Sequence, residues 1–361
     1  MSWLIAVVML GLLVLVHEAG HCVVARWSGV RVLRFSIGFG PVIWKRTLGG
    51  TEYAVSLLPL GGYVKMAGEE QADRGHPAKD EFLAQPIRVR ARIIAAGPLV
   101  NALVSVVTLW VVLVIGYPEL LPVIGKVMDE MPASAAGLQE GDRVRALDGA
   151  AVQTWDELTQ HVQQAADRPV TMAIEREGAS MELVVTPTPR EITDPFGRTR
   201  RVGLIGVSPR GEFATYKVSP LEAFRKTAEK EWEWLGHTGL SLWSLLTGRI
   251  SPKESLTGPI GIMVIASQAA QMGLSSLLYL VSIFSRSLAV FHFFPLPILD
   301  GGHLLFLVLE KLKGSPVSLR VQEKATQVSM ALLLALVVMV CVNDLSRFGL
   351  IDKLVGWWKP N

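Results

Sequence analysis

The sequence predicts a multi-span α-helical membrane protein with four transmembrane helices, a membrane-entering β-hairpin region and an inserted α+β extracytoplasmic domain. Half of the 361 residues are hydrophobic and the mean hydropathy is +0.38, which is high for a soluble protein of this length. Four apolar segments reach the roughly 20 residues that a spanning helix needs at about 1.5 Å per residue. Between the second and third of them lies a long stretch of soluble composition.

The predicted spans cover approximately residues 3–25, 93–115, 274–294 and 325–342. The first lacks the basic start and the cleavage site of a signal peptide, so we expect it to stay in the mature protein. Lysine and arginine are concentrated in the loops between spans one and two and between spans three and four. These loops are therefore expected in the cytoplasm, with both termini and region 117–273 on the opposite side.

Charge and cysteine content exclude two other classes of protein. A net charge of +3, without basic runs interleaved with aromatic residues, argues against binding to nucleic acid. Cys22 and Cys341 lie in apolar segments far apart in the sequence, so we expect two buried thiols and no disulfide.

The first span carries three ionisable residues in the run LLVLVHEAGHCVV. His17 and His21 are four residues apart, so they project from one face of a helix and can bind the same metal ion. Glu18 lies beside them, as in the H-E-x-x-H pattern, where the glutamate takes a proton from the attacking water. A chance match is the alternative, but ionisable groups at membrane depth cost at least a few kcal/mol each, which favours a functional site.

A catalytic zinc ion needs a third protein ligand. In FHFFPLPILDGGH, residues 291–303, Asp300 is the acidic residue most embedded in apolar surroundings. The prolines and glycines around it unwind the backbone, which is tolerated at membrane depth where it lines a cavity. We therefore expect Asp300 to meet the two histidines. Two alternatives are a helix-capping role for Asp300 and a ligand role for His303.

Residues 31–65 alternate apolar and polar side chains around glycines, which predicts short strands and turns that are apolar enough to enter the bilayer. If the HEAGH site attacks a peptide carbonyl at membrane depth, a helical substrate must first unwind, and an edge strand can pair with the freed backbone. We expect that edge at Gly61, Gly62, Tyr63 and Val64. The alternative is a cytoplasmic sheet without substrate contact.

Asn101, near the start of the second span, is a polar amide among apolar residues and needs a partner. Two roles are open at this point. The side chain lines a substrate-binding cavity near the metal, or it forms a hydrogen bond between helices.

Residues 117–208 show short strands, the helix WDELTQHVQQAA and a hairpin that turns at Glu177 and Gly178. This order resembles a single, circularly permuted PDZ domain. The resemblance implies that a peptide C-terminus binds near RVGLIGV, and filtering of substrates by size is the alternative. Residues 209–273 then predict an amphipathic helix at 219–247 and a linker. The tryptophans of that helix, with Trp357 and Trp358, suit the membrane surface, and packing against the PDZ-like domain is the competing interpretation.

Several of these motifs together resemble the site-2 protease family of M50-type intramembrane zinc metalloproteases, and within it the bacterial regulator of sigma-E protease branch. The motifs are HEAGH, FSIGFGP, LLPLGGYVKMAGE, AAGPLVN, the PDZ-like region and PLPILDGGH, in the expected order over nearly the whole chain. The resemblance implies one zinc ion held by His17, His21 and Asp300, with Glu18 as acid and base. It divides the chain into membrane core 1–116, PDZ-like domain 117–208, helix and linker 209–273, and membrane core 274–361.

Two positions depart from the family pattern. The family usually has asparagines in the third span, one of which helps to hold the substrate backbone; this chain has His292 there and Ser287 at the earlier position. His292 either donates one hydrogen bond to the substrate or is an ordinary polar residue that faces a cavity.

The resemblance implies a zinc-dependent endopeptidase of the bacterial inner membrane that cleaves transmembrane segments of single-span proteins. The implied substrates are anti-sigma factors after a first cut and remnant signal peptides, with the PDZ-like domain and both termini in the periplasm. Two alternatives are a membrane-anchored zinc peptidase for soluble peptides and an inactive PDZ scaffold.

Overall fold

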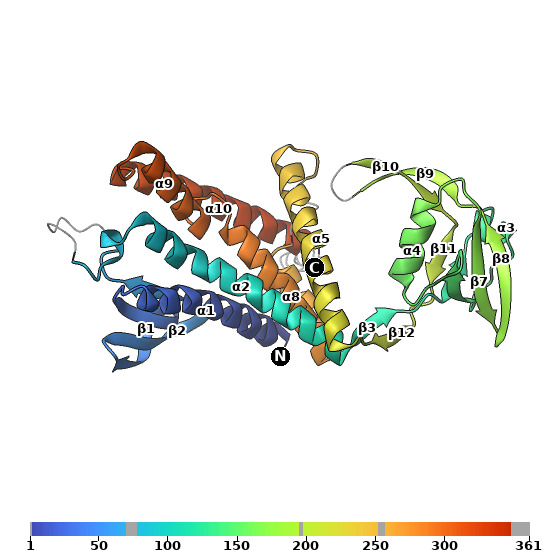
Figure 1. Ribbon diagram of the computed structural model, residues 1–361, viewed down its shortest axis with the longest axis horizontal. Helices are drawn as coiled ribbons and strands as arrows, with labels where there is room; N and C mark the ends of the chain where they lie inside the picture. Colours follow the sequence, from blue (N-terminus) through green and yellow to red (C-terminus); the bar gives the residue numbers. More distant parts are fainter. Residues whose placement is uncertain (1, 70–77, 195–197, 252–256, 348–361) are drawn as a thin grey trace, which may run out of the picture. The chain divides into compact units, whose positions relative to one another are not determined.

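A computed structural model describes residues 2–69, 78–194, 198–251 and 257–347, so the predicted anchors Trp357 and Trp358 lie outside the described residues. The chain forms two compact units (Figure 1). Unit 1 comprises residues 1–111 and 255–361, and unit 2 comprises residues 112–254. Each unit is described separately below.

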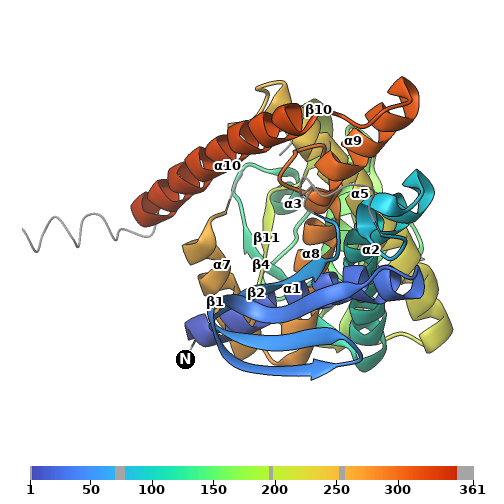
Figure 2. The ribbon, with the colours of Figure 1, turned by 90° about the vertical axis from the view of Figure 1, so that its left-hand side faces the viewer.

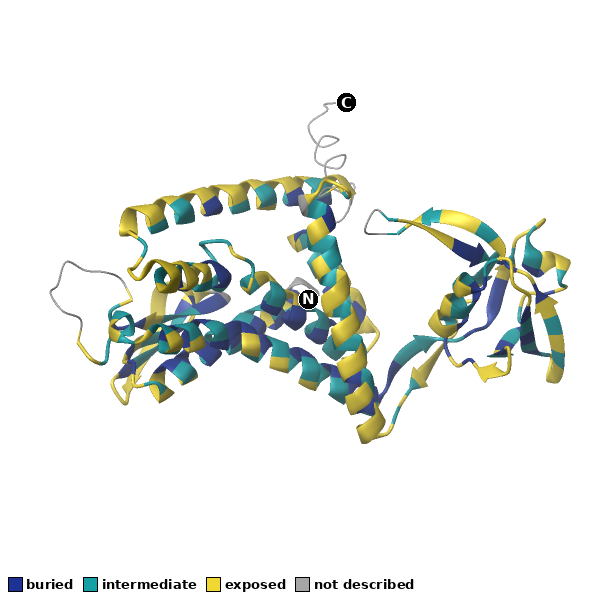
Figure 3. Ribbon diagram, turned by 45° about the horizontal axis from the view of Figure 1, so that its top comes forward, coloured by how far each residue is buried: buried dark blue, intermediate teal, exposed yellow. Residues whose placement is uncertain are grey.

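Among the described residues, four helices are long and apolar enough to cross a membrane, which confirms the four predicted spans. They are α1 (Ser2–Trp27), α2 (Ile87–Ile115), α8 (Leu274–His292) and α10 (Leu319–Arg347). Helix α2 begins six residues earlier than predicted, because the apolar window excluded its first, arginine-rich turns although arginine is a good helix former. Most of their surface is exposed or half-buried, as expected for helices that face lipid (Figure 3).

The other helices of unit 1 are shorter. They are η1 (Phe82–Ala84), α7 (Pro259–Gln271) and α9 (Asp300–Lys313). Helix α9 begins directly after the proline-containing turn that ends α8. Its C-terminus is closed by Gly314, whose φ of 77° lies in the left-handed region that glycine adopts at helix ends.

The predicted β region forms two long strands, β1 (Val32–Leu48) and β2 (Thr51–Met66), that lie alongside α1 (Figure 2). Residues 34–37 of β1 pair with residues 62–65 of β2 on one side and with residues 52–55 on the other. The segment 62–65 is therefore an edge among the described residues. Its neighbour in space is α1, so the edge of the sheet faces the HEAGH motif.

In the part of unit 2 that the structure describes, the strands form one four-stranded sheet and three two-stranded pairs. The sheet has the order β6-β5-β7-β8, and the pairs are β4 with β11, β3 with β12 and β9 with β10. The strands are β3 (Tyr117–Leu120), β4 (Ile124–Val127), β5 (Arg143–Leu147), β6 (Ala150–Ala151), β7 (Val170–Arg176), β8 (Ala179–Val185), β9 (Thr188–Thr193), β10 (Thr199–Leu204), β11 (Val207–Pro209) and β12 (Phe213–Tyr216).

The helices described in unit 2 are α3 (Pro132–Ala135), α4 (Trp155–Gln164) and α5 (Pro220–Leu246). Helix α4 starts with a capping box, in which the Thr154 hydroxyl and the Glu157 carboxylate each bind a backbone N–H of the first turn. Its buried residues Leu158 and Val162 pack against the sheet in one hydrophobic core. Strands β7 and β8 turn at Glu177 and Gly178, both with positive φ, as a tight hairpin requires.

Candidate metal centre

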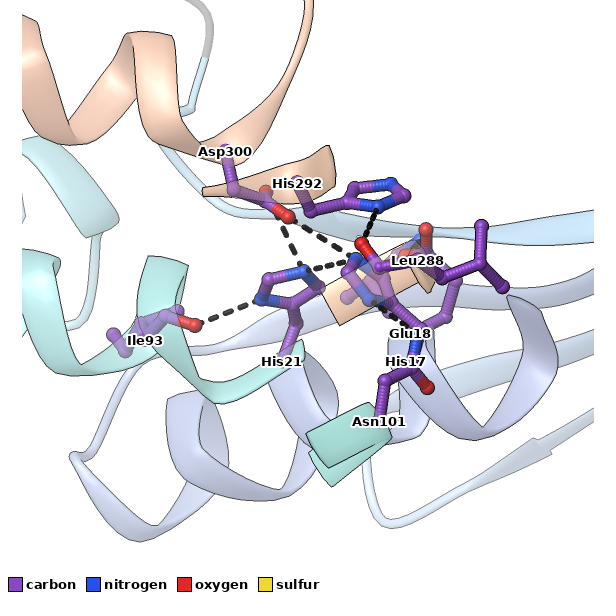
Figure 4. Close-up of polar contacts among 9 residues, drawn as sticks. His17, Glu18, His21, Ile93, Asn101, Leu288, His292 and Asp300 are labelled. Carbon is purple, nitrogen blue, oxygen red and sulfur yellow. Dashed lines mark hydrogen bonds and ion pairs between the residues drawn. The ribbon is translucent and has the colours of Figure 1, made fainter. Parts of the chain in front are cut away.

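The two histidines of HEAGH converge inside unit 1. His17 and His21 are 3% and 8% exposed, and their Nε2 atoms lie 3.1 Å apart. The spacing of four residues on α1 produces this arrangement, because side chains at i and i+4 share one helix face. The Nε2 atoms of the two rings point at the same small volume (Figure 4).

Asp300, the first residue of α9, completes the cluster. Its Oδ2 lies 3.1 Å from Nε2 of His17, and its Oδ1 lies 3.5 Å from Nε2 of His21. The two glycines that follow allow this approach, since a Cβ on Gly301 would lie 2.3 Å from the Phe294 carbonyl oxygen. A Cβ on Gly302 would lie 2.2 Å from the Leu296 carbonyl oxygen. The helix can therefore start close against the preceding turn and direct Asp300 at α1.

These three residues fit a zinc ion. Their ligand atoms all lie within 4.8 Å of one another. Asp300 Oδ2 is buried, and apart from the adjacent Nε2 of His17 it has no polar partner among the described residues, which a bound cation would compensate. Two imidazoles and one carboxylate are also the ligand types that zinc prefers, and three protein ligands leave a position for substrate or water.

The main chain of α2 orients His21. Nδ1 of His21 lies 2.8 Å from the carbonyl oxygen of Ile93, so this nitrogen carries a proton and donates it. In the neutral ring, Nε2 then keeps its lone pair for a metal. Metal-binding histidines are commonly held in this way by a carbonyl or carboxylate behind the ring.

Asn101 is placed behind His17. Its side chain is fully buried, and its Nδ2 lies 3.3 Å from Nδ1 of His17. Its Oδ1 has no hydrogen-bond partner among the described residues. Turning the carboxamide by 180° brings Oδ1 to Nδ1 of His17, which could then donate to it and leave Nε2 free for the metal. The substrate-binding role of Asn101 stays a prediction, and its buried position next to His17 favours a role in orienting that ring.

Replacing Asn101 by alanine is accordingly expected to weaken zinc binding by about 10- to 100-fold, the usual effect of losing a residue that orients a ligand. Competition with a chromophoric chelator measures the change in Kd. Replacing Ser287, whose exposed hydroxyl donates to the Ile283 carbonyl oxygen on its own helix, serves as the control and should leave the Kd unchanged. An unchanged Kd in Asn101→Ala would contradict the orienting role.

Gly97 is a site residue that the sequence analysis did not single out. A Cβ built on Gly97 would lie 2.3 Å from Nε2 of His21 and 2.7 Å from Nε2 of His17. The α carbon of Gly97 therefore borders the volume where the candidate metal ligands meet. The signal was present in AAGPLVN, because a glycine inside an apolar helix often marks a close approach.

Glu18 lies next to the cluster but outside it. Its Oε2 accepts a hydrogen bond of 3.1 Å from the backbone N–H of Val64, in the edge segment of β2. Gly61 and Gly62 precede this contact and are buried, while Tyr63 is half-buried and stacks on Phe39 at 6.0 Å between ring centroids. The predicted segment Gly61 to Val64 thus lies beside the HEAGH motif.

His292 approaches the site without joining the cluster. Its ring centroid lies 4.3 Å from that of His17, and its Nδ1 donates to the Leu288 carbonyl oxygen at 2.8 Å (Figure 4). Ser287 is exposed and bonds to its own helix. His303, the alternative ligand, is exposed on α9 and is not part of the metal-binding group found among the described residues.

Comparison with known proteins identifies the family. The model of peptidase family M50 matches residues 5–336. The chain belongs to peptidase family M50. A protein of Rhizobium meliloti (strain 1021) that carries a zinc metalloprotease name is 36% identical over 358 residues, covering 94% of each chain.

Two further relatives are regulator of sigma-E proteases. The protein of Salmonella typhimurium (strain 14028s / SGSC 2262) is 32% identical over 448 aligned residues, and that of Escherichia coli (strain K12) is 31% identical. In both cases the match covers 94% of this chain and 97% of the relative. The resemblance to site-2 proteases is confirmed, and this M50 peptidase is a zinc metalloprotease that works in a membrane.

Proposed function

We propose that this M50 peptidase cleaves transmembrane segments of single-span membrane proteins, with one zinc ion held by His17, His21 and Asp300. The observation that carries the proposal is the position of the cluster. His17 and His21 lie on a helix that is apolar enough to span a membrane, and both are buried among other apolar helices. A substrate bond cleaved there must itself lie in a membrane segment.

Glu18 is proposed as the general base. When bound, zinc polarises the scissile carbonyl and lowers the pKa of a water molecule. Glu18 is the carboxylate next to the ligands, and it can take a proton from the attacking water and return it to the leaving amine. The N–H of Val64 holds one of its oxygens, which leaves the other free for this proton.

The edge of β2 is proposed to bind the substrate as an added strand. Residues 62–65 pair with β1 on one side only among the described residues, and the other side faces Glu18. A substrate segment that unwinds there regains backbone hydrogen bonds that lipid cannot provide. Nδ1 of His292 donates to the Leu288 carbonyl oxygen, so its Nε2 is the nitrogen that is proposed to contact the same substrate segment.

The β region, strands β1 and β2, is proposed to enter the membrane. The exposed apolar side chains of these strands support this proposal. At the bend of β1 and β2 a group of exposed apolar residues would otherwise face water. They are Ile37, Phe39, Val42, Ile43, Trp44, Leu57 and Leu58.

Unit 2 is proposed to contain the periplasmic PDZ-like domain, residues 117–208, in a protein of the bacterial inner membrane. Its four-stranded sheet, helix α4 and shared core are compatible with such a domain. The domain would bind a peptide C-terminus or filter substrates by size. Two relatives carry the name regulator of sigma-E protease. This name suggests anti-sigma factors after a first cut, together with remnant signal peptides, as substrates.

One comparison tests the intramembrane activity. The purified protein in lipid vesicles is given a single-span reporter and, separately, the reporter's transmembrane sequence as a peptide solubilised by lysine tags. We expect cleavage of the embedded reporter within its apolar segment. Cleavage of soluble peptides alone would show a membrane-anchored peptidase instead, and a wild type that binds no zinc and cleaves neither substrate would favour the scaffold.

A further inference from the structure

A largely buried ion pair lies away from the proposed metal centre and links α2 to α9. Arg90 donates to Glu310 through two nitrogens, with N–O distances of 3.1 and 2.5 Å, and its Nε donates to the Gln85 carbonyl oxygen at 3.1 Å. The side chains of Arg90 and Glu310 are only 9% and 14% exposed. Among the described residues, the Arg90–Glu310 contacts join the start of α2 to the last turns of α9 through charged groups.

The two helices that this pair joins both contribute to the metal centre. Helix α9 begins with Asp300, and Glu310 follows ten residues later, about 15 Å along the axis at about 1.5 Å per residue. Helix α2 holds His21 through the Ile93 carbonyl oxygen, and Ile93 lies one turn after Arg90. Neighbouring turns of α2 thus hold His21 and the helix that carries Asp300.

A contribution to stability alone does not explain such a pair. Removing two charges from water is costly, and a pair of apolar residues of similar volume is often at least as stable. The geometry gives a different reason, because the planar guanidinium binds both carboxylate oxygens and so fixes direction as well as distance. A helix held at both ends cannot slide along its neighbour.

We propose that Arg90 and Glu310 are positioning residues for the metal centre, which set the place of Asp300 relative to His21. The inference rests on the proposed ligand set. Gly301 and Gly302 fix the beginning of α9 against the preceding turn, and the Arg90–Glu310 pair fixes its other end. A displaced α9 would move the carboxylate away from the two Nε2 atoms and weaken metal binding.

The test separates positioning from stability. Zinc Kd, from chelator competition, and the thermal unfolding midpoint are measured for Arg90→Met, Glu310→Leu and the double variant in detergent. Arg88→Met is the matched control, since Arg88 is exposed near the start of the same helix and pairs with no described residue. Arg90→Lys is added because it keeps the charge and loses the two-pronged contact.

The double variant decides the outcome, because it leaves no unpaired buried charge and should unfold near the wild-type temperature. We expect its zinc Kd to rise by about 10- to 100-fold, as for other residues that orient ligands, while Arg88→Met stays at the wild-type value. The zinc Kd of Arg90→Lys should lie between that of the double variant and that of Arg88→Met. A double variant with wild-type zinc affinity would overturn the proposal and leave the pair a structural role only. A double variant that does not fold would also overturn it, because the pair would then be needed for folding itself.

Asp300→Ala distinguishes this inference from the ligand assignment on which it depends. If the wild type binds zinc, Asp300→Ala loses it and the double variant keeps full affinity, only the positioning role fails. If Asp300→Ala binds zinc as tightly as the wild type, the ligand assignment itself fails.

Discussion

Replacing Glu18 by glutamine is expected to abolish proteolysis while one zinc ion per chain stays bound. Glutamine has nearly the same shape as glutamate and can still contact the Val64 N–H through its carbonyl oxygen, but it cannot take a proton from water. General base catalysis typically contributes about 10²- to 10⁴-fold to the rate, so the loss should be at least of that size. Cleavage of a single-span reporter and zinc content, measured on the same preparation, check both parts.

Glu323→Gln provides the control, because Glu323 is exposed on α10 and its replacement removes the same charge elsewhere. It should cleave like the wild type. Wild-type cleavage rates in Glu18→Gln would rule out Glu18 as the base. Loss of zinc together with activity would instead assign Glu18 a part in holding the metal.

Replacing Gly97 by alanine should remove zinc binding almost completely. The added Cβ would lie 2.3 Å from Nε2 of His21 and 2.7 Å from Nε2 of His17, so at least one ligand must leave its position. Within a helix the same change normally favours folding by about 0.5–1 kcal/mol, so an effect on helix formation cannot explain the loss. Zinc content after dialysis against a weak chelator, with reporter cleavage, measures the result.

Gly239→Ala in α5 is the matched control, because the Cβ built at Gly239 has no described atom within 4 Å. It should keep the wild-type zinc content. If Gly97→Ala also keeps one zinc ion and full activity, the two histidines do not bind the metal in the arrangement described here.

The residues of the proposed metal centre differ in how far the sequence could predict their positions. HEAGH is a local pattern, so its geometry follows from helix periodicity alone. Asp300 could be predicted because a lone carboxylate in an unwound apolar segment is costly without a role. Gly97 could not be assigned, because its importance depends on how closely α2 packs against α1, and the same holds for the pairing of Arg90 with a glutamate 220 positions away.

The β region and Asn101 likewise have contacts that depend on tertiary packing and could not be predicted from the sequence. Alternation of apolar and polar residues predicted strands at 31–65, but the pairing of residues 34–37 with two separate segments of β2 depends on the bends of both strands. A polar partner for Asn101 was expected from its apolar neighbours. Its partner, Nδ1 of His17 on α1, could not be predicted, because it depends on how α2 packs against α1.

The most direct test of the account is the zinc content of the purified wild type compared with His17→Ala and Asp300→Ala. The account predicts about one zinc ion per wild-type chain, little or none in either variant, and loss of reporter cleavage in both. Asp300→Ala is the more informative of the two, since its ligand role depends on a contact between distant parts of the chain. A full complement of zinc at unchanged affinity in Asp300→Ala would contradict the proposed centre.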